Sequence, residues 1–534
     1  MESSASIRLS FLFLLLSVLL VELKAAFPPP RTRAPFNTPY ATGSFAFKSP
    51  LAQQYLVPQR LPGLDFSIQH SYAGRMNISV NPRQAAQMFF WFIPADDVRG
   101  SRDLTIWANG DACSRLVGAF QANGPITMNQ GRVKPTKNPH SWTRSSHMLY
   151  LDIPLNVGFS RGRVAQRSSD DIAGFVFNFL IAFLKVFPEM EGLNLYSKPG
   201  WHAYSGTYIS YAADKIYAYQ SQLTLKLQGI LLVNAFISTS TLQQHVPIAS
   251  YVVENNNAFK FDAAQLRKLQ ETDRECGFSD YLINVGLSLD NQYAPIIYQP
   301  KDLLLLIQNL HYPPRGPFPD VTKALDPTRP AQFRDQCLIY MQMFEESSPD
   351  MNLWNIHDRP GMSDPNYTKF VYPGRADVQR AFNVAGSRHW ASCGDIGQVG
   401  SFKNIADKHT GMIVLRAPIR YFQTETRPTC HFKGLAQCDQ RSKRVVIAHG
   451  ILDATLLTDG VKLAIQSMNW GGEQGFQQPI NSEFVVAGTP SGKYHTERGL
   501  TFVEVTQSGS VIPHDYGQAG LEIFEYLLGR RPTP

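Results

Sequence analysis

Short apolar runs bounded by turn-forming residues recur along most of this chain. Those with the length of buried strands are residues 87–93, 104–107, 148–151, 229–236, 444–448 and 501–505. Between the third and fourth runs, residues 168–187 repeat apolar positions with helical periodicity and end at Pro188. Strands that alternate with helices predict a central, mostly parallel sheet with helices on both faces.

Three segments depart from this alternation. Residues 1–26 combine a charged start, a short apolar run and a pair of alanines, which predicts a signal peptide, with an uncleaved anchor as the alternative. Residues 27–60 are Pro-rich, and we expect an N-terminal arm or a propeptide remnant there. About residues 240–410, polar loops and helices predict an inserted cap region over the carboxyl edge of the sheet, where open α/β folds bind ligands. We therefore expect one domain over residues 61–532.

The composition limits the kinds of partner and cofactor that we expect for this chain. The chain has 534 residues, of which 43% are hydrophobic, which is enough material for a large core. Its net charge of +7 is spread thinly, so we expect neither nucleic acid nor a membrane surface as a partner. No Cys or His pair has zinc-binding spacing, and we expect no metal and no cofactor.

Two further features indicate the secretory pathway. The six cysteines are even in number, which favours disulfides over free thiols in a secreted chain. The tripeptides that begin at Asn77 and Asn366 are glycosylation sequons. Together with the signal peptide, they predict a protein that is secreted or stays in the lumen of the pathway.

Several segments, in order along the chain, resemble secreted fungal serine carboxypeptidases. Residues 72–74 (Tyr-Ala-Gly) look like the family's N-terminal strand motif, and residues 151–160 are similar to its Leu-Asp-Gln-Pro-x-Gly-x-Gly-Phe-Ser segment. The sequences of residues 464–470 and 495–500 are similar to the corresponding segments of the fungal subgroup. The resemblance covers roughly residues 65–530. It implies the α/β-hydrolase fold and, as the family's activity, removal of C-terminal residues from peptides.

The nucleophile of the family is absent from its expected position. The family's turn reads Gly-Glu-Ser-Tyr-Ala/Gly-Gly, and Tyr204 and Gly206 align with its last residues. That alignment places His202 opposite the glutamate and Ala203 opposite the serine. Alanine has no oxygen that could attack a carbonyl carbon. An alternative register would use Ser205 as the nucleophile.

The acid of the triad is retained, and the base is replaced. Asp453 ends a segment that resembles the fungal His-Gly-Leu-Leu-Asp motif, so the resemblance implies that it is the triad acid. Its alternative role is that of an N-cap for a helix expected over residues 454–468. Ser510 stands where the family's Gly-His-Met-Val-Pro motif has its histidine. His514 is a possible substitute, although it lies past a proline turn and is more typical of a surface histidine.

The resemblance also assigns the oxyanion and substrate-carboxylate sites. Gly110 and Tyr204 fall in the oxyanion region, where the loop is one residue shorter than in the family and carries Asp111 in place of a glycine. Of the residues that bind the substrate's free carboxylate, Asn109 is retained. One acidic residue has become Ala122, and the other is His202, which could bind a carboxylate as a cation.

The resemblance implies one disulfide, between Cys113 and Cys393. Cys430 and Cys438 could close a short loop, which would leave Cys276 with Cys337. Six cysteines allow 15 pairings, so these last two pairs remain hypotheses.

Three hypotheses for function follow. The leading one is a secreted, catalytically impaired or inactive carboxypeptidase-like protein, with peptide or protein C-termini as its possible partners. The second is an active serine-type carboxypeptidase that uses Ser205 and a relocated histidine. The third is a glycosylated interaction or structural protein with a closed cleft.

Overall fold

The computed structural model describes about two thirds of the chain. The described residues are 47, 49–79, 85–97, 100, 102–109, 116, 118–128, 135–163, 169–199, 205–238, 240–284, 337–348, 351–358, 372–386 and 444–534. All of them belong to one compact unit, Gly43–Pro534. The predicted signal peptide lies outside them. Within the described part of the chain, no helix is long and apolar enough to cross a membrane.

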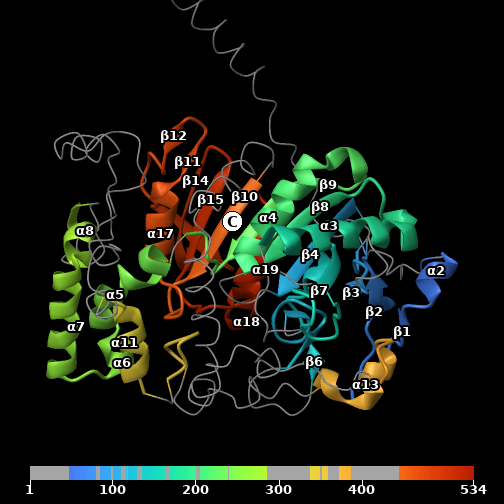
Figure 1. Ribbon diagram of the computed structural model, residues 1–534, viewed down its shortest axis with the longest axis horizontal. Helices are drawn as coiled ribbons and strands as arrows, with labels where there is room; N and C mark the ends of the chain where they lie inside the picture. Colours follow the sequence, from blue (N-terminus) through green and yellow to red (C-terminus); the bar gives the residue numbers. More distant parts are fainter. Residues whose placement is uncertain are drawn as a thin grey trace, which may run out of the picture. The chain divides into compact units, whose positions relative to one another are not determined.

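An eleven-stranded sheet forms the centre of this unit, with the strand order β1-β2-β3-β7-β4-β8-β9-β10-β15-β14-β13 (Figure 1). The strands are β1 Leu56–Val57, β2 Ser71–Asn77, β3 Gln87–Ile93, β4 Asp103–Asn109, β7 His147–Asp152, β8 Asn194–Pro199, β9 Lys226–Val233, β10 Arg444–Gly450, β13 Ser482–Val486, β14 Thr489–Glu497 and β15 Leu500–Val505. The strands from β7 to β15 in this order pair in parallel, and the outer ones pair antiparallel. The predicted mostly parallel sheet is confirmed.

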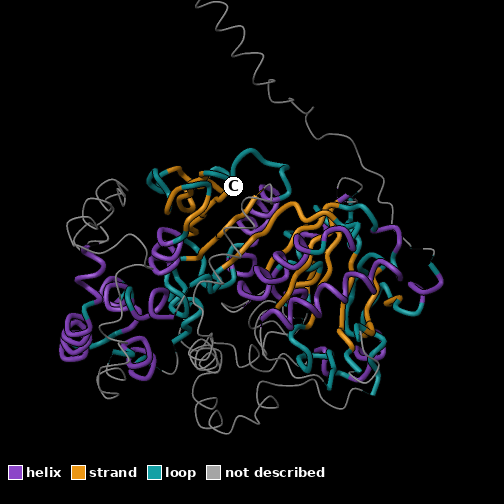
Figure 2. The backbone as a smooth tube through the Cα atoms, turned by 45° about the horizontal axis from the view of Figure 1, so that its top comes forward, coloured by secondary structure: helices purple, strands orange, loops and turns teal. Residues whose placement is uncertain are grey.

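Helices cover both faces of the sheet because its central strands are apolar on both sides (Figure 2). On one face lie α3 (Ser169–Val186), α4 (Ser205–Ala218) and α17 (Thr458–Ser467). On the other face lie α19 (Gly517–Leu527) and η3 (Gly118–Ala122). In β10, for example, Val445 and Ile447 pack into the first layer, whereas Val446 and Ala448 pack into the second.

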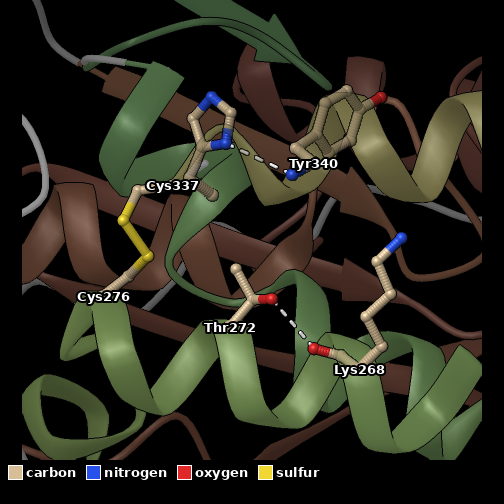
Figure 3. Close-up of a disulfide and its surroundings, with 6 residues drawn as sticks. Lys268, Thr272, Cys276, Cys337 and Tyr340 are labelled. Carbon is tan, nitrogen blue, oxygen red and sulfur yellow. Dashed lines mark hydrogen bonds between the residues drawn. A yellow bond between two sulfur atoms is a disulfide. The ribbon is translucent and has the colours of Figure 1, made fainter. Parts of the chain in front are cut away.

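The predicted insertion contains a separate group of helices. They are η7 Thr241–His245, α5 Ile248–Glu254, α6 Asn256–Phe259, α7 Ala263–Cys276, α8 Phe278–Asn284 and α11 Ile339–Glu346. A disulfide joins Cys276 at the end of α7 to Cys337 just before α11, which is the pairing expected for these two cysteines (Figure 3). Lys268 and Glu346 form an ion pair of 2.9 Å between the same two helices.

Shorter elements complete the described chain. They are α2 Pro50–Gln53, β5 Ile126–Thr127, β6 Thr136–Lys137, η4 Trp142–Arg144, η5 Pro188–Met190, η6 Gln220–Gln222, η9 Tyr372–Gly374, α13 Ala376–Ala381, β11 Asn469–Trp470, β12 Glu473–Gln474 and α18 Ile512–Asp515.

The folded unit includes residues that the sequence analysis placed in an N-terminal arm. Phe47 is buried, with its ring centroid 5.3 Å from that of Tyr72 and 5.4 Å from that of Phe92. Val57 is buried as well, and β1 pairs with β2. Isolated aromatic residues in a Pro-rich segment carry no periodicity, so the pattern did not reveal that they reach the core.

Two element boundaries differ from those expected. The strand predicted over residues 229–236 ends at Val233, because Asn234 has a φ of 44° and turns the chain out of the sheet. The helix expected over residues 454–468 begins only at Thr458. The residues before it form a turned loop, whose polar groups bind one another and the insertion.

Candidate active site

Asp453, the predicted triad acid, lies in a buried loop directly after β10. We call residues 451–456 the acid loop. Asp453 is fully buried, and its carboxylate accepts four hydrogen bonds. Oδ1 accepts from the Thr455 amide at 2.7 Å, the Thr455 hydroxyl at 2.5 Å and the Leu456 amide at 3.2 Å. Oδ2 accepts from the Asn234 side-chain amide at 2.8 Å. Asp453 therefore caps a turn inside its own loop, and the alternative role as the N-cap of the next helix is wrong, because that cap position is Leu457.

Burial dominates the electrostatics of this carboxylate. It raises the pKa of Asp453 to about 6, although the hydrogen bonds from Thr455 and Asn234 favour the charged form. A carboxyl group with this pKa changes charge in mildly acidic solution. The charge of the site therefore changes near pH 6.

Asn234 is a residue of the site that the sequence analysis missed. Besides the bond to Asp453, the side-chain oxygen of Asn234 accepts a hydrogen bond from the Gly450 amide at 3.2 Å. The backbone amide of Asn234 donates to the Ala448 carbonyl at 3.0 Å. Asn234 therefore links the carboxyl ends of β9 and β10. An asparagine at the end of a predicted strand was the available signal, since asparagine tolerates positive φ better than most residues.

The loop that carries the base position is held against the acid loop by backbone contacts. We call residues 506–511, which follow β15, the base loop. The Leu452 amide donates to the Ser508 carbonyl at 3.0 Å. A Cβ on Gly450 would overlap the Ser508 and Gly509 carbonyl oxygens, so only glycine permits this close approach.

Ser510 is buried, at 3% exposure, within this packed region. Its amide donates to the Trp354 carbonyl at 2.7 Å, and the neighbouring Gly509 amide donates to Asp515 Oδ2 at 2.8 Å. These bonds come from the backbone amides of residues 509 and 510 and not from the Ser510 side chain. The base loop therefore has a defined conformation around Ser510, the residue predicted to stand at the base position.

A short segment of the insertion, residues 351–358, bridges the two loops. The Ile356 amide donates to the Leu452 carbonyl at 3.0 Å, and the Ala454 amide donates to the Leu353 carbonyl at 2.8 Å. Asn355 donates to Asp515 at 3.1 Å. Acid loop, base loop and insertion therefore form one hydrogen-bonded unit.

His514 is held on the other side of the base loop, in α18. Its Nδ1 lies 2.7 Å from the Gln121 carbonyl oxygen of η3, which orients the imidazole toward that helix. Within the described part of the chain, the hydrogen-bond donors to the Asp453 carboxylate come from Asn234, Thr455 and Leu456, none of which is a histidine.

The nucleophile region follows β8, and most of it lies outside the described residues. Ser205 is the first residue of α4, and Gly206 packs closely on Ala235 beyond β9. Asn109 is the last residue of β4, and Ala122, which is buried, ends η3. Predicted site residues that fall outside the description are Gly110, Asp111, Cys113, His202, Ala203, Tyr204, Asn366, Cys393, Cys430 and Cys438.

Strand order explains how these distant segments come together. The strands β8, β9, β10 and β15 are neighbours and run parallel, so their carboxyl ends meet at one edge of the sheet. Segments that carry the nucleophile, acid and base positions follow β8, β10 and β15. Among the described residues, no group of three His, Cys, Asp or Glu side chains is arranged to hold a metal ion.

Comparison with known proteins shows to which family this chain is related. A family model described as serine carboxypeptidase matches residues 62–530. A probable serine carboxypeptidase of Arthroderma benhamiae is 26% identical over 508 residues, a match that covers 88% of this chain and 85% of the relative. The serine-type carboxypeptidase F of Aspergillus niger is 27% identical over 509 residues, with coverage of 89% and 87%.

Solved structures agree on the fold. The structure is similar to that of a prohormone-processing carboxypeptidase from Saccharomyces cerevisiae, with a TM-score of 0.62 and 19% identity. The match covers 90% of this chain and 96% of that one. With this α/β-hydrolase fold and a family match that spans most of its length, the chain belongs to the serine carboxypeptidase family.

Proposed function

We propose that this family member is a catalytically inactive serine carboxypeptidase-like protein that binds peptide or protein C-termini without cleaving them. The observation that carries the proposal is at residue 510. Bonds from Ser510 and Gly509 hold the base loop in place, but serine has no ring nitrogen to take a proton from a nucleophile. Ala203 removes the nucleophile as well. Members of a triad act as a unit, so these two losses remove nearly all of its contribution.

His514 is poorly suited to replace the missing base. Its Nδ1 is engaged with the Gln121 carbonyl, and it belongs to α18, beyond Pro513. The Asp453 carboxylate is already bound by Asn234 on one oxygen and by Thr455 and Leu456 on the other. For His514 to act as the base, α18 and the base loop would both have to rearrange.

The proposed ligand is the carboxylate at the end of a peptide chain. By resemblance, Asn109 and His202 occupy two of the positions with which the family binds this group. Histidine becomes a cation in mildly acidic solution and then attracts a carboxylate. Binding should therefore strengthen as the pH falls from about 7 to about 5.

A closed scaffold is the second candidate, and the dense packing of the acid loop favours it. Binding experiments separate the two candidates. The probe is a set of peptides with free C-termini, compared with the same peptides amidated at the C-terminus. Binding that needs the free carboxylate and is lost in His202→Ala supports the C-terminus binder. Equal, weak binding of both sets supports the closed scaffold.

Residual catalysis is tested separately with a fluorophosphonate probe and with peptide hydrolysis near pH 5. The proposal expects neither labelling nor hydrolysis. Specific labelling that disappears in Ser205→Ala would show instead that Ser205 is a working nucleophile. The carboxypeptidase F of Aspergillus niger serves as the positive control in both assays.

The proposed location is the secretory pathway or the extracellular space. Its support is the charged and apolar start of the chain together with the disulfide between Cys276 and Cys337. Expression of the full chain in a fungal host, followed by N-terminal sequencing of protein from the medium, tests the location and the predicted cleavage near residue 26.

A further inference from the structure

The acid loop makes an unusual set of bonds to the insertion. The Tyr340 hydroxyl of α11 donates to the Ala454 carbonyl at 3.1 Å and lies 3.3 Å from the Thr455 carbonyl. The Gln244 side chain of η7 donates to the same Thr455 carbonyl at 2.7 Å. All four residues are buried.

These two carbonyls belong to the peptide groups that bind Asp453. The Ala454 carbonyl shares its peptide plane with the Thr455 amide, and the Thr455 carbonyl shares its plane with the Leu456 amide. In a trans peptide, the oxygen and the hydrogen point in opposite directions. Each plane therefore accepts a hydrogen bond from the insertion at one end and donates one to Asp453 Oδ1 at the other.

Hydrogen bonds relayed through a peptide group in this way affect the carboxylate at the far end. A donor at the carbonyl fixes the rotation of the peptide plane, and it polarises the amide, which strengthens the bond at the far end. Both effects stabilise the charged carboxylate. From the insertion, Tyr340 and Gln244 thus act on Asp453 without touching it.

Tyr340 is itself held in place by independent contacts. Its amide donates to His245 Nδ1 at 3.3 Å, and the disulfide at Cys337 ties the start of α11 to α7 (Figure 3). Burial lowers the pKa of His245 to about 4, so the ring stays neutral and can accept that bond above this pH. Burial raises the pKa of Tyr340 well above its usual range, so its hydroxyl remains a donor.

We propose that Tyr340 and Gln244 are positioning residues for the acid: through the two peptide planes of residues 454–456 they orient the Asp453 carboxylate and polarise the amides that bind it. The proposal concerns the acid alone, and it holds whether or not the protein hydrolyses peptides. It assigns the insertion a role as the support of the Asp453 carboxylate.

The test is the titration of Asp453 in the full chain, followed by the ¹³Cγ resonance of labelled aspartate and assigned with Asp453→Asn. In Tyr340→Phe the ring remains and the donor is lost. We expect Asp453 to bind its proton about threefold more tightly than in the wild type, a rise of about half a pKa unit. Gln244→Met should move the midpoint in the same direction.

Tyr251→Phe is the matched control. The Tyr251 hydroxyl donates to the Ile451 carbonyl of the same loop at 3.1 Å, but the amide in that peptide plane is that of Leu452, which binds Ser508 and not Asp453. This variant loses the same kind of bond, so its midpoint should stay at the wild-type value. If Tyr340→Phe and Tyr251→Phe titrate alike, the proposal is wrong. If Tyr340→Phe does not fold, an unchanged midpoint in Gln244→Met overturns the proposal, and a raised one supports it.

Discussion

The side-chain amide of Asn234 donates to the Asp453 carboxylate at 2.8 Å, so a residue just beyond β9 fixes the acid that follows β10. The same side chain accepts a bond from the Gly450 amide at the end of β10. Asn234 therefore connects the ends of two neighbouring strands and holds the buried Asp453 carboxylate between them.

The stability of the protein should depend on pH through Asp453. Its pKa is raised to about 6 in the folded state, above the value of about 3.9 expected in the unfolded chain. The folded state therefore binds the proton more tightly, and Asp453 lowers stability as the pH rises from about 4 to about 6. Asp453→Asn lacks this titration.

Urea unfolding of both proteins between pH 4 and pH 7 measures the effect. As the pH rises, the unfolding free energy of the wild type should fall relative to that of Asp453→Asn by up to about 3 kcal/mol. A difference that stays constant over this range would contradict the raised pKa.

Restoring the two missing triad residues should not restore full activity. If the proposed roles are correct, the double variant Ala203→Ser, Ser510→His supplies a nucleophile and a base again, but it keeps the short predicted oxyanion loop with Asp111. Loss of one oxyanion donor typically costs about 100- to 1,000-fold in rate. We expect kcat/KM for peptide hydrolysis to remain at least about 100-fold below that of the Aspergillus niger enzyme. Comparable values for the two proteins would show that the loop is functional.

The close approach of the base loop to the insertion should make Gly509 irreplaceable. A Cβ there would overlap the Trp354 carbonyl oxygen, and backbone cannot move aside as a flexible side chain can. Gly509→Ala should therefore lower the unfolding free energy by about 3 kcal/mol. Gly174→Ala is the control, because a Cβ on this glycine of α3 would meet, among the described residues outside its own helix backbone, just the Lys215 ammonium group, at 3.8 Å. It should raise stability by about 0.5–1 kcal/mol.

Loss of the disulfide should destabilise the insertion. The cysteines Cys276 and Cys337 are 61 residues apart, and closing a loop of that length in the unfolded chain corresponds to about 4 kcal/mol. We expect the Cys276→Ser, Cys337→Ser double variant to show this loss in urea unfolding. Hydrogen exchange should rise first in α7 and α11, before the central strands. Uniform exchange throughout the chain would mean that the insertion does not unfold separately.

Asn77 should carry a glycan in protein made by a eukaryotic secretory host. It is the last residue of β2 and is exposed, and its side-chain oxygen accepts a bond from the Ser79 amide at 3.0 Å. Asn77→Gln should remove one endoglycosidase-sensitive mass increment, whereas Ser79→Thr preserves the sequon and should retain it. An identical mass for wild type and Asn77→Gln would show that the site is not used.

Much of the fold was predictable from the sequence because buried strands need continuous apolar runs. The runs at 87–93 and 444–448 correspond to β3 and β10. β8 was missed, since its sequence Asn-Leu-Tyr-Ser-Lys-Pro mixes polar and apolar residues without a clear period. It lies between β4 and β9, and its hydrogen bonds to both of them stabilise it as a strand.

The candidate site was only partly predictable. Asp453 and Ser510 were proposed as the acid and base positions from the motifs around them, and these roles stay predictions. Asn234, Gln244 and Tyr340 carry no motif, and they come from segments that lie 114 to 219 residues from the residues they bind. A hydrogen bond over such a separation depends on how the chain folds back, which no local pattern records.

By itself, the sequence determined the mostly parallel sheet, and it led to the hypothesis that the family's nucleophile and base are replaced at Ala203 and Ser510. These follow from apolar periodicity and from the identity of single side chains. Only the tertiary structure decided which groups surround Asp453. Its pKa and orientation depend on burial and on hydrogen-bond donors from Asn234, just beyond β9, and from the acid loop. These contacts exist only in the folded chain.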